Sequence, residues 1–154
     1  MAEEATSSDR SVGFTITRVF EAPPERVWKA FTQPDQFAQW FGGADATVSD
    51  VAMDVRVGGE WRAIMHLPDA PDISWAGEYR EVDEPSKLVL TFKNPSNHND
   101  PNREVVTVVF TDQGGKTQIV YTQQGNMQQD EYGRAEAGTQ LFLDSMEELL
   151  KKQT

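Results

Sequence analysis

The C-terminal segment, residues 129–152, constrains the fold more than any other part of the chain. Placed on a helix of about 3.6 residues per turn, it separates apolar from charged residues. The inner side holds Ala135, Gly138, Phe142, Ser145, Met146 and Leu149, with Leu141 on one edge and Leu143 and Leu150 on the other. We therefore predict one amphipathic helix, roughly 30 Å long, which is enough to cross a whole sheet.

The residues before position 127 follow a different pattern. β-Branched and aromatic residues alternate with polar ones, and turn residues recur about every ten positions. We predict strands at 13–21, 46–51, 60–67, 73–82, 87–93, 104–111 and 116–124. Glycine-containing turns such as Gly58-Gly59 join neighbouring strands as hairpins, so the sheet is predicted to be antiparallel.

Two short helices are expected between the first and second strands. One begins near Pro24 and the other near Pro34, at positions where the missing N–H of proline costs nothing, and Gly42-Gly43 ends the second. One long helix can cover a face of such a sheet only if the sheet curls around it. The space between them is then either filled by aromatic side chains or left partly open as a pocket.

Charge and composition narrow the possible partners. Lys and Arg number 14 and Asp and Glu number 25, which gives a formal net charge of −11 at pH 7. Because this charge repels phosphate backbones and anionic lipid surfaces, we expect neither nucleic acid nor a membrane as a partner. The chain has no cysteine, no apolar or basic leader and no run near the ~20 apolar residues of a membrane span, so we predict a cytoplasmic location.

Four motifs, RVFEAP at 18–23, VWKAFT at 27–32, DVRVGGEW at 54–61 and GEYREV at 77–82, resemble the START-like (SRPBCC) superfamily. They are most similar to the branch related to the C-terminal domain of the activator of the ninety-kilodalton heat-shock chaperone's ATPase. The similarity covers nearly the whole chain. It implies an α+β helix-grip fold, in which a curved seven-stranded antiparallel sheet wraps around the long C-terminal helix. Residues 12–152 are then one START-like domain, and residues 1–11 a flexible tail.

The resemblance also suggests functions. Superfamily members bind lipids, polyketides, hormones or other apolar molecules in a cavity between sheet and helix, and a minority catalyse reactions there. It therefore implies a small hydrophobic or amphipathic ligand. The alternatives are a chaperone-associated module that stimulates a heat-shock ATPase, and a cyclase- or hydrolase-type enzyme. Members of the branch often carry Gly-Trp in the last helix, whereas here Gly138 precedes Thr139, so one large cavity-side or packing group is missing.

Large apolar side chains at inward positions are the candidate ligand-binding residues. Trp75, Gly77 and Tyr79 share one strand face, in a large-small-large pattern that either interdigitates with opposing side chains or leaves a groove. A packed core is the alternative interpretation. The candidates are Trp40, Trp61, Met65, Trp75, Tyr79, Phe92, Phe110, Tyr121, Phe142 and Met146.

The polar residues give little sign of catalysis. His66, near a strand end, is either a general base at a cavity mouth or, as we favour, a side chain satisfied by a neighbour. His98 lies in the polar loop 94–103 beside one carboxylate, which does not fill a zinc site. No Ser-His-Asp order and no nucleophile, metalloprotease or nucleotide motif is found. We therefore predict no catalytic residue, no metal and no cofactor.

Two arginines raise the possibility of an anion anchor. Asp54 and Arg56 share a strand face, and we favour a salt bridge between them over a grip on a ligand carboxylate. Arg18 interrupts the apolar face of the first strand, where Glu21 or Glu81 is the expected partner.

Overall fold

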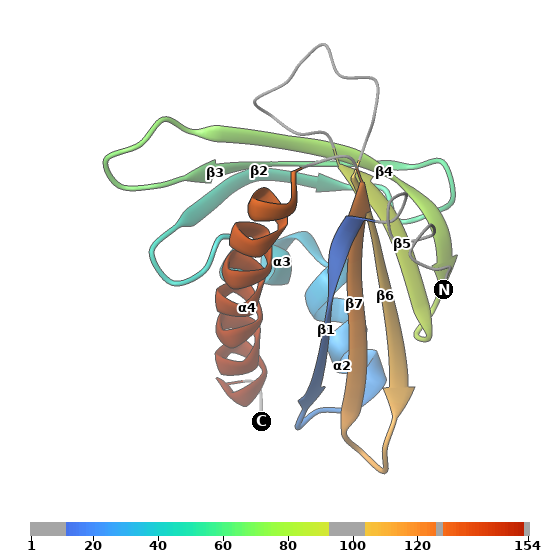
Figure 1. Ribbon diagram of the computed structural model, residues 1–154. Helices are drawn as coiled ribbons and strands as arrows, with labels where there is room; N and C mark the ends of the chain where they lie inside the picture. The colour runs from blue at the N-terminus through green and yellow to red at the C-terminus, as the bar shows by residue number, and fades with distance from the viewer. Residues whose placement is uncertain (1–11, 93–103, 126–127, 153–154) are drawn as a thin grey trace.

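The computed structural model describes residues 12–92, 104–125 and 128–152, which form one seven-stranded antiparallel sheet and three helices (Figure 1). In chain order these are β1 (Val12–Phe20), α2 (Pro24–Thr32), α3 (Pro34–Trp40), β2 (Thr47–Met53), β3 (Glu60–His66), β4 (Ile73–Asp83), β5 (Lys87–Phe92), β6 (Glu104–Asp112), β7 (Thr117–Gly125) and α4 (Gln129–Lys152). The predicted helix-grip fold is confirmed. The predicted tail 1–11 and the polar loop 94–103, with His98, lie outside the described residues.

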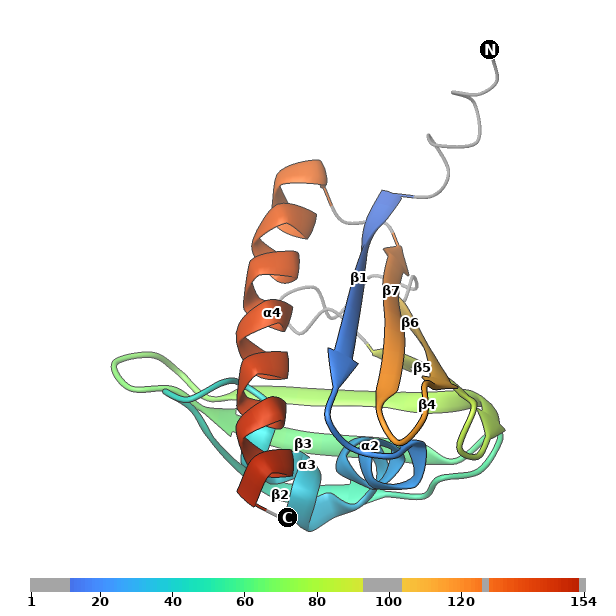
Figure 2. The same cartoon turned by 90° about the horizontal axis from the view of Figure 1, so that it is seen from below.

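The sheet is strongly curved. Its strand order is β1-β7-β6-β5-β4-β3-β2, so β1 and β2 are its two edges. Figures 1 and 2 show the wing formed by β2, β3 and β4 crossing the wing of β1, β7 and β6 at a steep angle, with α4 on the concave side. The helices α2 and α3 lie on the same side and contact α4, which also packs on β1. Among the described residues, no helix is long and apolar enough to cross a membrane.

Local sequence accounts for the ends of these elements. Pro24 and Pro34 occupy the first turns of α2 and α3, and each helix carries an acidic residue there that suits the helix dipole. The β2–β3 turn contains Gly58 with a φ of 86°, a value that side chains other than glycine's rarely adopt. In the β6–β7 turn, the Asp112 carboxylate accepts hydrogen bonds from two successive glycine N–H groups, at 3.1 and 3.2 Å.

The long helix divides into two parts. Its C-terminal part is solidly packed, with Leu143, Met146, Leu149 and Leu150 all at most 7% exposed. The predicted inner face is rotated from the observed one, since Leu141 is 61% exposed whereas both residues of the opposite edge are buried. The cause is that this part of α4 is contacted by β1 and also by α2 and α3, which shifts the buried stripe toward Leu143 and Leu150.

Arg18 fastens the middle of α4 to the edge strand β1. Its guanidinium lies 2.7 Å from the Asp144 carboxylate and 3.0 Å from that of Glu147, and it also donates to the backbone and side-chain oxygens of Gln140. The expected pairing of Arg18 with Glu21 or Glu81 is wrong, because the helix lies directly over this strand. Glu21 instead pairs with Lys116, and Glu81 pairs with Lys87.

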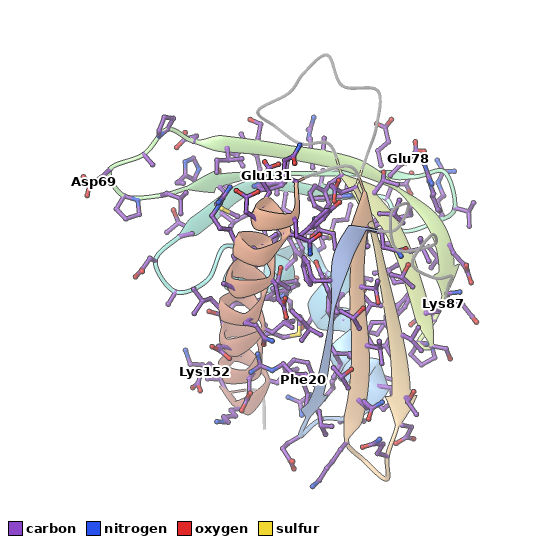
Figure 3. The ribbon with its side chains drawn as sticks, viewed as in Figure 1. Phe20, Asp69, Glu78, Lys87, Glu131 and Lys152 are labelled. Carbon is purple, nitrogen blue, oxygen red and sulfur yellow. The ribbon has the colours of Figure 1, made fainter. Side chains whose placement is uncertain are left out.

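The N-terminal end of α4 is held separately. Tyr132, in its first turn, donates a hydrogen bond of 2.8 Å to Glu104 Oε1 on β6, and Gln123 on β7 donates one of 3.0 Å to the same oxygen. All three residues are at most 4% exposed. A buried carboxylate is stable only with such partners, so this cluster ties α4 to the strands β6 and β7. Figure 3 shows the dense layer of side chains between helix and sheet.

We predict that Arg18→Met lowers the free energy of unfolding by about 1–2 kcal/mol, because it removes charge-assisted hydrogen bonds from a mostly buried guanidinium. The control Lys116→Met breaks the exposed pair with Glu21 and should change stability by less than about 0.5 kcal/mol. Urea unfolding of both variants checks this. Equal losses in the two would show that Arg18 is only another surface charge.

Candidate functional site

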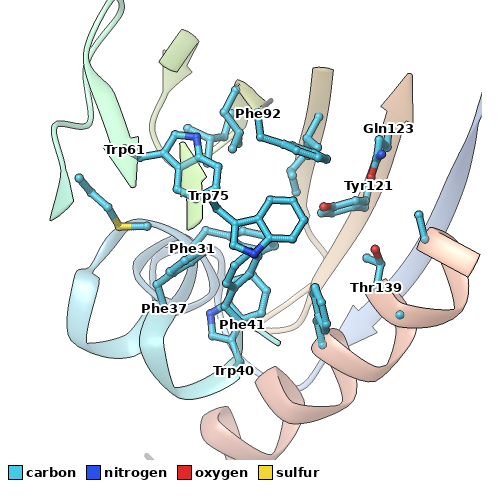
Figure 4. A pocket seen from close by; sticks show the side chains of 18 of the residues that line it. Phe31, Phe37, Trp40, Phe41, Trp61, Trp75, Phe92, Tyr121, Gln123 and Thr139 are labelled. Atoms are coloured by element: carbon cyan, nitrogen blue, oxygen red, sulfur yellow. The ribbon is translucent and has the colours of Figure 1, made fainter. Parts of the chain in front are cut away.

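A pocket of about 570 Å³ lies between the N-terminal part of α4 and the concave face of the sheet (Figure 4). Every strand from β2 to β7 contributes to its walls, together with all three helices. The lining residues are Phe31, Phe37, Trp40, Phe41, Met53, Trp61, Ile73, Trp75, Tyr79, Leu88, Leu90, Phe92, Val106, Val108, Tyr121, Gln123, Arg134, Ala135, Gly138, Thr139 and Phe142. Nearly all are apolar or aromatic, so the pocket is suited to an apolar molecule.

Phe41, just after α3, is the centre of the aromatic wall. Its ring stacks on Phe37 with centroids 4.5 Å apart and makes edge contacts with Trp61, Trp75 and Phe142, at 6.2, 5.8 and 5.4 Å. These contacts join α3, β3, β4 and α4. Interlocking rings of this kind resist rearrangement, so this wall is held open as a defined surface.

Two of the three pocket tryptophans have their indole N–H groups satisfied by the backbone. Trp40 Nε1 donates to the Ala30 carbonyl at 2.7 Å, and Trp61 Nε1 donates to the Thr91 carbonyl at 2.9 Å. The second bond depends on Gly77, which pairs with Trp61 across the strands. A Cβ at Gly77 would overlap the Thr91 carbonyl oxygen and lie 2.7 Å from Trp61 Nε1. The small residue predicted to leave room between large rings therefore makes room for the Trp61 indole.

Trp75 is the third pocket tryptophan, and it differs from the other two. Its Nε1 atom is buried, yet no acceptor among the described residues lies within hydrogen-bond distance. The ring is fixed by edge contacts with Phe41 and with Phe92, the latter at 5.4 Å. Figure 4 shows the Trp75 indole beside Phe41, among the side chains that line the pocket. A buried donor without an acceptor costs about 1–3 kcal/mol, so folded proteins seldom keep such a group unpaired.

The opposite side of the pocket is more polar. Figure 4 shows Tyr121, Gln123 and Thr139 there, on β7 and α4. Tyr121 is half-buried because one side of it borders the pocket. Desolvation nevertheless raises the pKa of its phenol well above the ordinary 10.0, and a hydrogen bond with the Thr139 hydroxyl only partly offsets this. Burial likewise raises the pKa of Tyr79, and the negative charge of Asp54 adds to the effect. Both phenols are therefore neutral at physiological pH.

Seven of the ten predicted ligand-binding residues line the pocket: Trp40, Trp61, Trp75, Tyr79, Phe92, Tyr121 and Phe142. The other three lie outside its lining. Phe110 packs edge-on against Trp28 and Phe31, with ring centroids 5.4 and 5.5 Å away. Met146 is fully buried in the packed part of α4, and Met65 is 3% exposed and lies beside Gly42. Whether any of the ten contacts a ligand stays a prediction.

The sequence does not predict the centre of the aromatic wall, and it predicts only Tyr121 on the polar side of the pocket. Phe37 and Phe41 were visible as apolar residues at helical spacing, but the spacing did not show that Phe41 follows the helix and faces inward. Gln123 and Thr139 are polar, and a polar residue gives no sequence sign that it faces an apolar pocket. One sequence feature could have indicated Thr139. Related chains often have a tryptophan after the glycine that corresponds to Gly138, and the smaller threonine leaves space between the helix and the sheet.

Ser49, His66 and Asp72 come together on the wing of β2 and β3. Ser49 Oγ lies 2.7 Å from His66 Nε2, and Asp72 Oδ1 lies 2.9 Å from His66 Nδ1. No Ser-His-Asp order was predicted, because only the pairing of β2 with β3 brings these residues together. The arrangement has the atom order of a nucleophile triad. However, none of the three lines the pocket, and the side chains of His66 and Asp72 are 38% and 57% exposed. We therefore interpret it as a surface cluster that fastens the edge strand, with His66 satisfied by its neighbours as expected.

The remaining polar candidates are also structural. Arg56 Nε lies 2.9 Å from Asp54 Oδ2, and neither residue lines the pocket, so the predicted salt bridge is confirmed. In the part of the chain that the structure describes, no three His, Cys, Asp or Glu residues are grouped to hold a metal ion.

Comparison with known families gives one match over most of the chain. Residues 21–151 match the family model described as Activator of Hsp90 ATPase homolog 1-like protein. No curated protein matches the chain.

Solved structures with the same fold come from several bacteria. Protein CV1439 from Chromobacterium violaceum is 22% identical, with a TM-score of 0.79 over 88% of this chain and 95% of that one. Protein SA2116 from Staphylococcus aureus, described as of unknown function, is 22% identical, with a TM-score of 0.79 over 93% and 95%. Protein Ms6760 from Mycobacterium smegmatis is 26% identical, with a TM-score of 0.75 over 88% of each chain. These similarities show the fold and no particular ligand.

The raised pKa of Tyr121 predicts a stability effect at alkaline pH. Above pH 10.0 the unfolded chain loses this phenolic proton while the folded protein keeps it. The free energy of unfolding should therefore fall as the pH rises above 10.0, by roughly 1 kcal/mol per pH unit for this group. Tyr121→Phe should remove that part of the slope. Urea unfolding between about pH 9 and 11 measures it, and equal slopes in wild type and variant would contradict the assignment.

Proposed function

The chain belongs to the family of Activator of Hsp90 ATPase homolog 1-like proteins, and on this premise we propose that it binds a small hydrophobic or amphipathic molecule in the pocket between the sheet and α4. The fold of this family commonly binds hydrophobic ligands. The proposal is of a binding protein, because the described residues of the pocket include no nucleophile with an adjacent base and no metal-ligand set.

The size and chemistry of the pocket carry the proposal. A volume of about 570 Å³ lies within the ~300–1,000 Å³ typical of small-molecule sites. The walls would gain van der Waals contacts if they packed together, so an apolar pocket of this size is unfavourable for a protein that needs only to fold. A bound molecule would supply those contacts.

The way α4 is held supports the same proposal. The Tyr132–Glu104 hydrogen bond fixes one end of the helix, and the packed residues after Leu143 fix the rest. The pocket-lining residues of α4 lie between or beside these attachments, at positions 134–142. The helix thus crosses the pocket without collapsing into it, which leaves a preformed site.

The description of the family favours a second candidate, contact with a heat-shock chaperone. The partner would then be the ninety-kilodalton chaperone, and the chain would act through its surface. Adding the purified chain to that chaperone and measuring ATP hydrolysis separates the two candidates. A rate that rises with the concentration of the chain supports the second candidate, and an unchanged rate rules it out.

We predict that Gly138→Phe weakens binding of an apolar probe, such as N-phenylnaphthylamine, by about tenfold or more. Gly138 lines the pocket, and nothing lies within 4 Å of a Cβ built there, so the new ring would enter open space without distorting the fold. Probe fluorescence gives the affinity, and thermal unfolding shows that the variant is folded.

Gly133→Phe is the matched control. Gly133 lies on the same helix, is exposed, has the same open surroundings and does not line the pocket. Both substitutions gain similar helix propensity, so stability should change alike while only the first affects binding. Equal affinity in the two variants would exclude this pocket as the binding site.

A further inference from the structure

We propose that the ligand carries an uncharged carbonyl-type oxygen and that Trp75 Nε1–H donates a hydrogen bond to it inside the pocket. This inference rests on the proposed function and specifies the chemistry of the molecule that fills the site. The ligand is then a mostly apolar ring or chain with one hydrogen-bond acceptor, such as a ketone, in place of a pure hydrocarbon or a carboxylate.

The three pocket indoles differ in how their N–H groups are satisfied. Trp40 and Trp61 each donate to a backbone carbonyl, at 2.7 and 2.9 Å. Trp75 has the same donor, also buried, with no acceptor among the described residues. An indole can only donate, so a ligand that satisfies it must bring an acceptor.

The Trp75 donor is also held in place. Edge contacts from Phe41, at 5.8 Å and 80°, and from Phe92, at 5.4 Å and 72°, fix the ring on two sides. A rigid donor loses little freedom when it binds, so one hydrogen bond contributes to affinity and to orientation. The aromatic wall then faces the apolar part of the ligand.

The charges around the pocket argue against an anionic ligand. Arg134 is the one charged residue among the described residues that line it, and its side chain is 71% exposed and lies 3.6 Å from Asp130. A carboxylate beside Trp75 would be buried without a cation, which is unfavourable. The amide of Gln123 already donates to Glu104, and the phenols of Tyr79 and Tyr121 stay protonated and neutral, so none of these groups supplies a positive charge. A neutral oxygen is the acceptor that this environment tolerates.

Three probes of nearly equal shape test the inference on the full chain: isopropylnaphthalene, acetylnaphthalene and naphthoate. The first has no acceptor, the second a neutral carbonyl, and the third a carboxylate at neutral pH. Calorimetric or fluorescence titration should show acetylnaphthalene binding about three- to tenfold more tightly than isopropylnaphthalene, the range of one net hydrogen bond. Naphthoate should bind more weakly than acetylnaphthalene.

The donor is identified by variants and by the indole N–H signals in a nitrogen–proton NMR spectrum. Trp75→Phe assigns the Trp75 signal by its loss and should reduce the affinity ratio of ketone to hydrocarbon to about one. Tyr79→Phe and Tyr121→Phe, which remove the two phenol donors that also line the pocket, should each leave that ratio above one. In the wild-type protein, acetylnaphthalene should move the Trp75 signal downfield, and isopropylnaphthalene should not.

The outcomes separate this inference from the proposed function. If none of the three probes binds, the proposed function fails and the inference with it. If ketone and hydrocarbon bind equally, the pocket binds apolar molecules but Trp75 does not select them, and the inference alone is overturned. It is also overturned if naphthoate binds best, or if Tyr79→Phe or Tyr121→Phe, rather than Trp75→Phe, abolishes the preference for the ketone.

Discussion

The structure depends on how α4 is attached to a sheet that is wider than a single helix can cover. α4 is fixed at its first turn by the hydrogen bond from Tyr132 to the buried Glu104, in its middle by Arg18, and over its last turns by packed leucines and a methionine. From Tyr132 to Leu143 such a helix rises about 16 Å. Over that distance the helix lies opposite aromatic side chains of the curved sheet, and the pocket occupies the space that neither fills. The positions of these attachments therefore determine where the pocket lies.

Much of the fold follows from local pattern. Alternation and turn residues located all seven strands, and the helical period located 129–152 to the residue, because each element buries one face and shows the period of its own geometry. The rotation of α4 was not predictable in this way. Leu141 and Leu143 are equally apolar, and only the packing of β1, α2 and α3 around the helix decides which of them is buried. The pairing of Arg18 with Asp144 was not predictable for the same reason, because the two residues lie more than a hundred positions apart in the sequence.

The sequence predicts most of the aromatic residues that line the pocket, but it does not predict how they are arranged. Large aromatic residues at inward positions gave most of the wall, but the same property could not separate Trp75, which faces open space, from Phe110, which is packed against other rings. Nor could it show that Trp40 and Trp61 find backbone carbonyls and Trp75 does not, because each of those bonds depends on tertiary contacts. The Ser49–His66–Asp72 cluster shows the converse: atoms can align in a familiar order on an exposed wing with no enclosed site beside them.

The division of α4 has a consequence for divergence within the family. Residues that secure the helix and residues that face the pocket are different sets on one element, so a wall residue can change while the attachments persist. Substitutions can then change the lining of the pocket in small steps without unfolding the protein. Solved structures that share about a fifth to a quarter of their residues with this chain still have the same fold, with TM-scores of 0.75 to 0.79. One architecture is therefore compatible with wide variation in the residues that face the pocket.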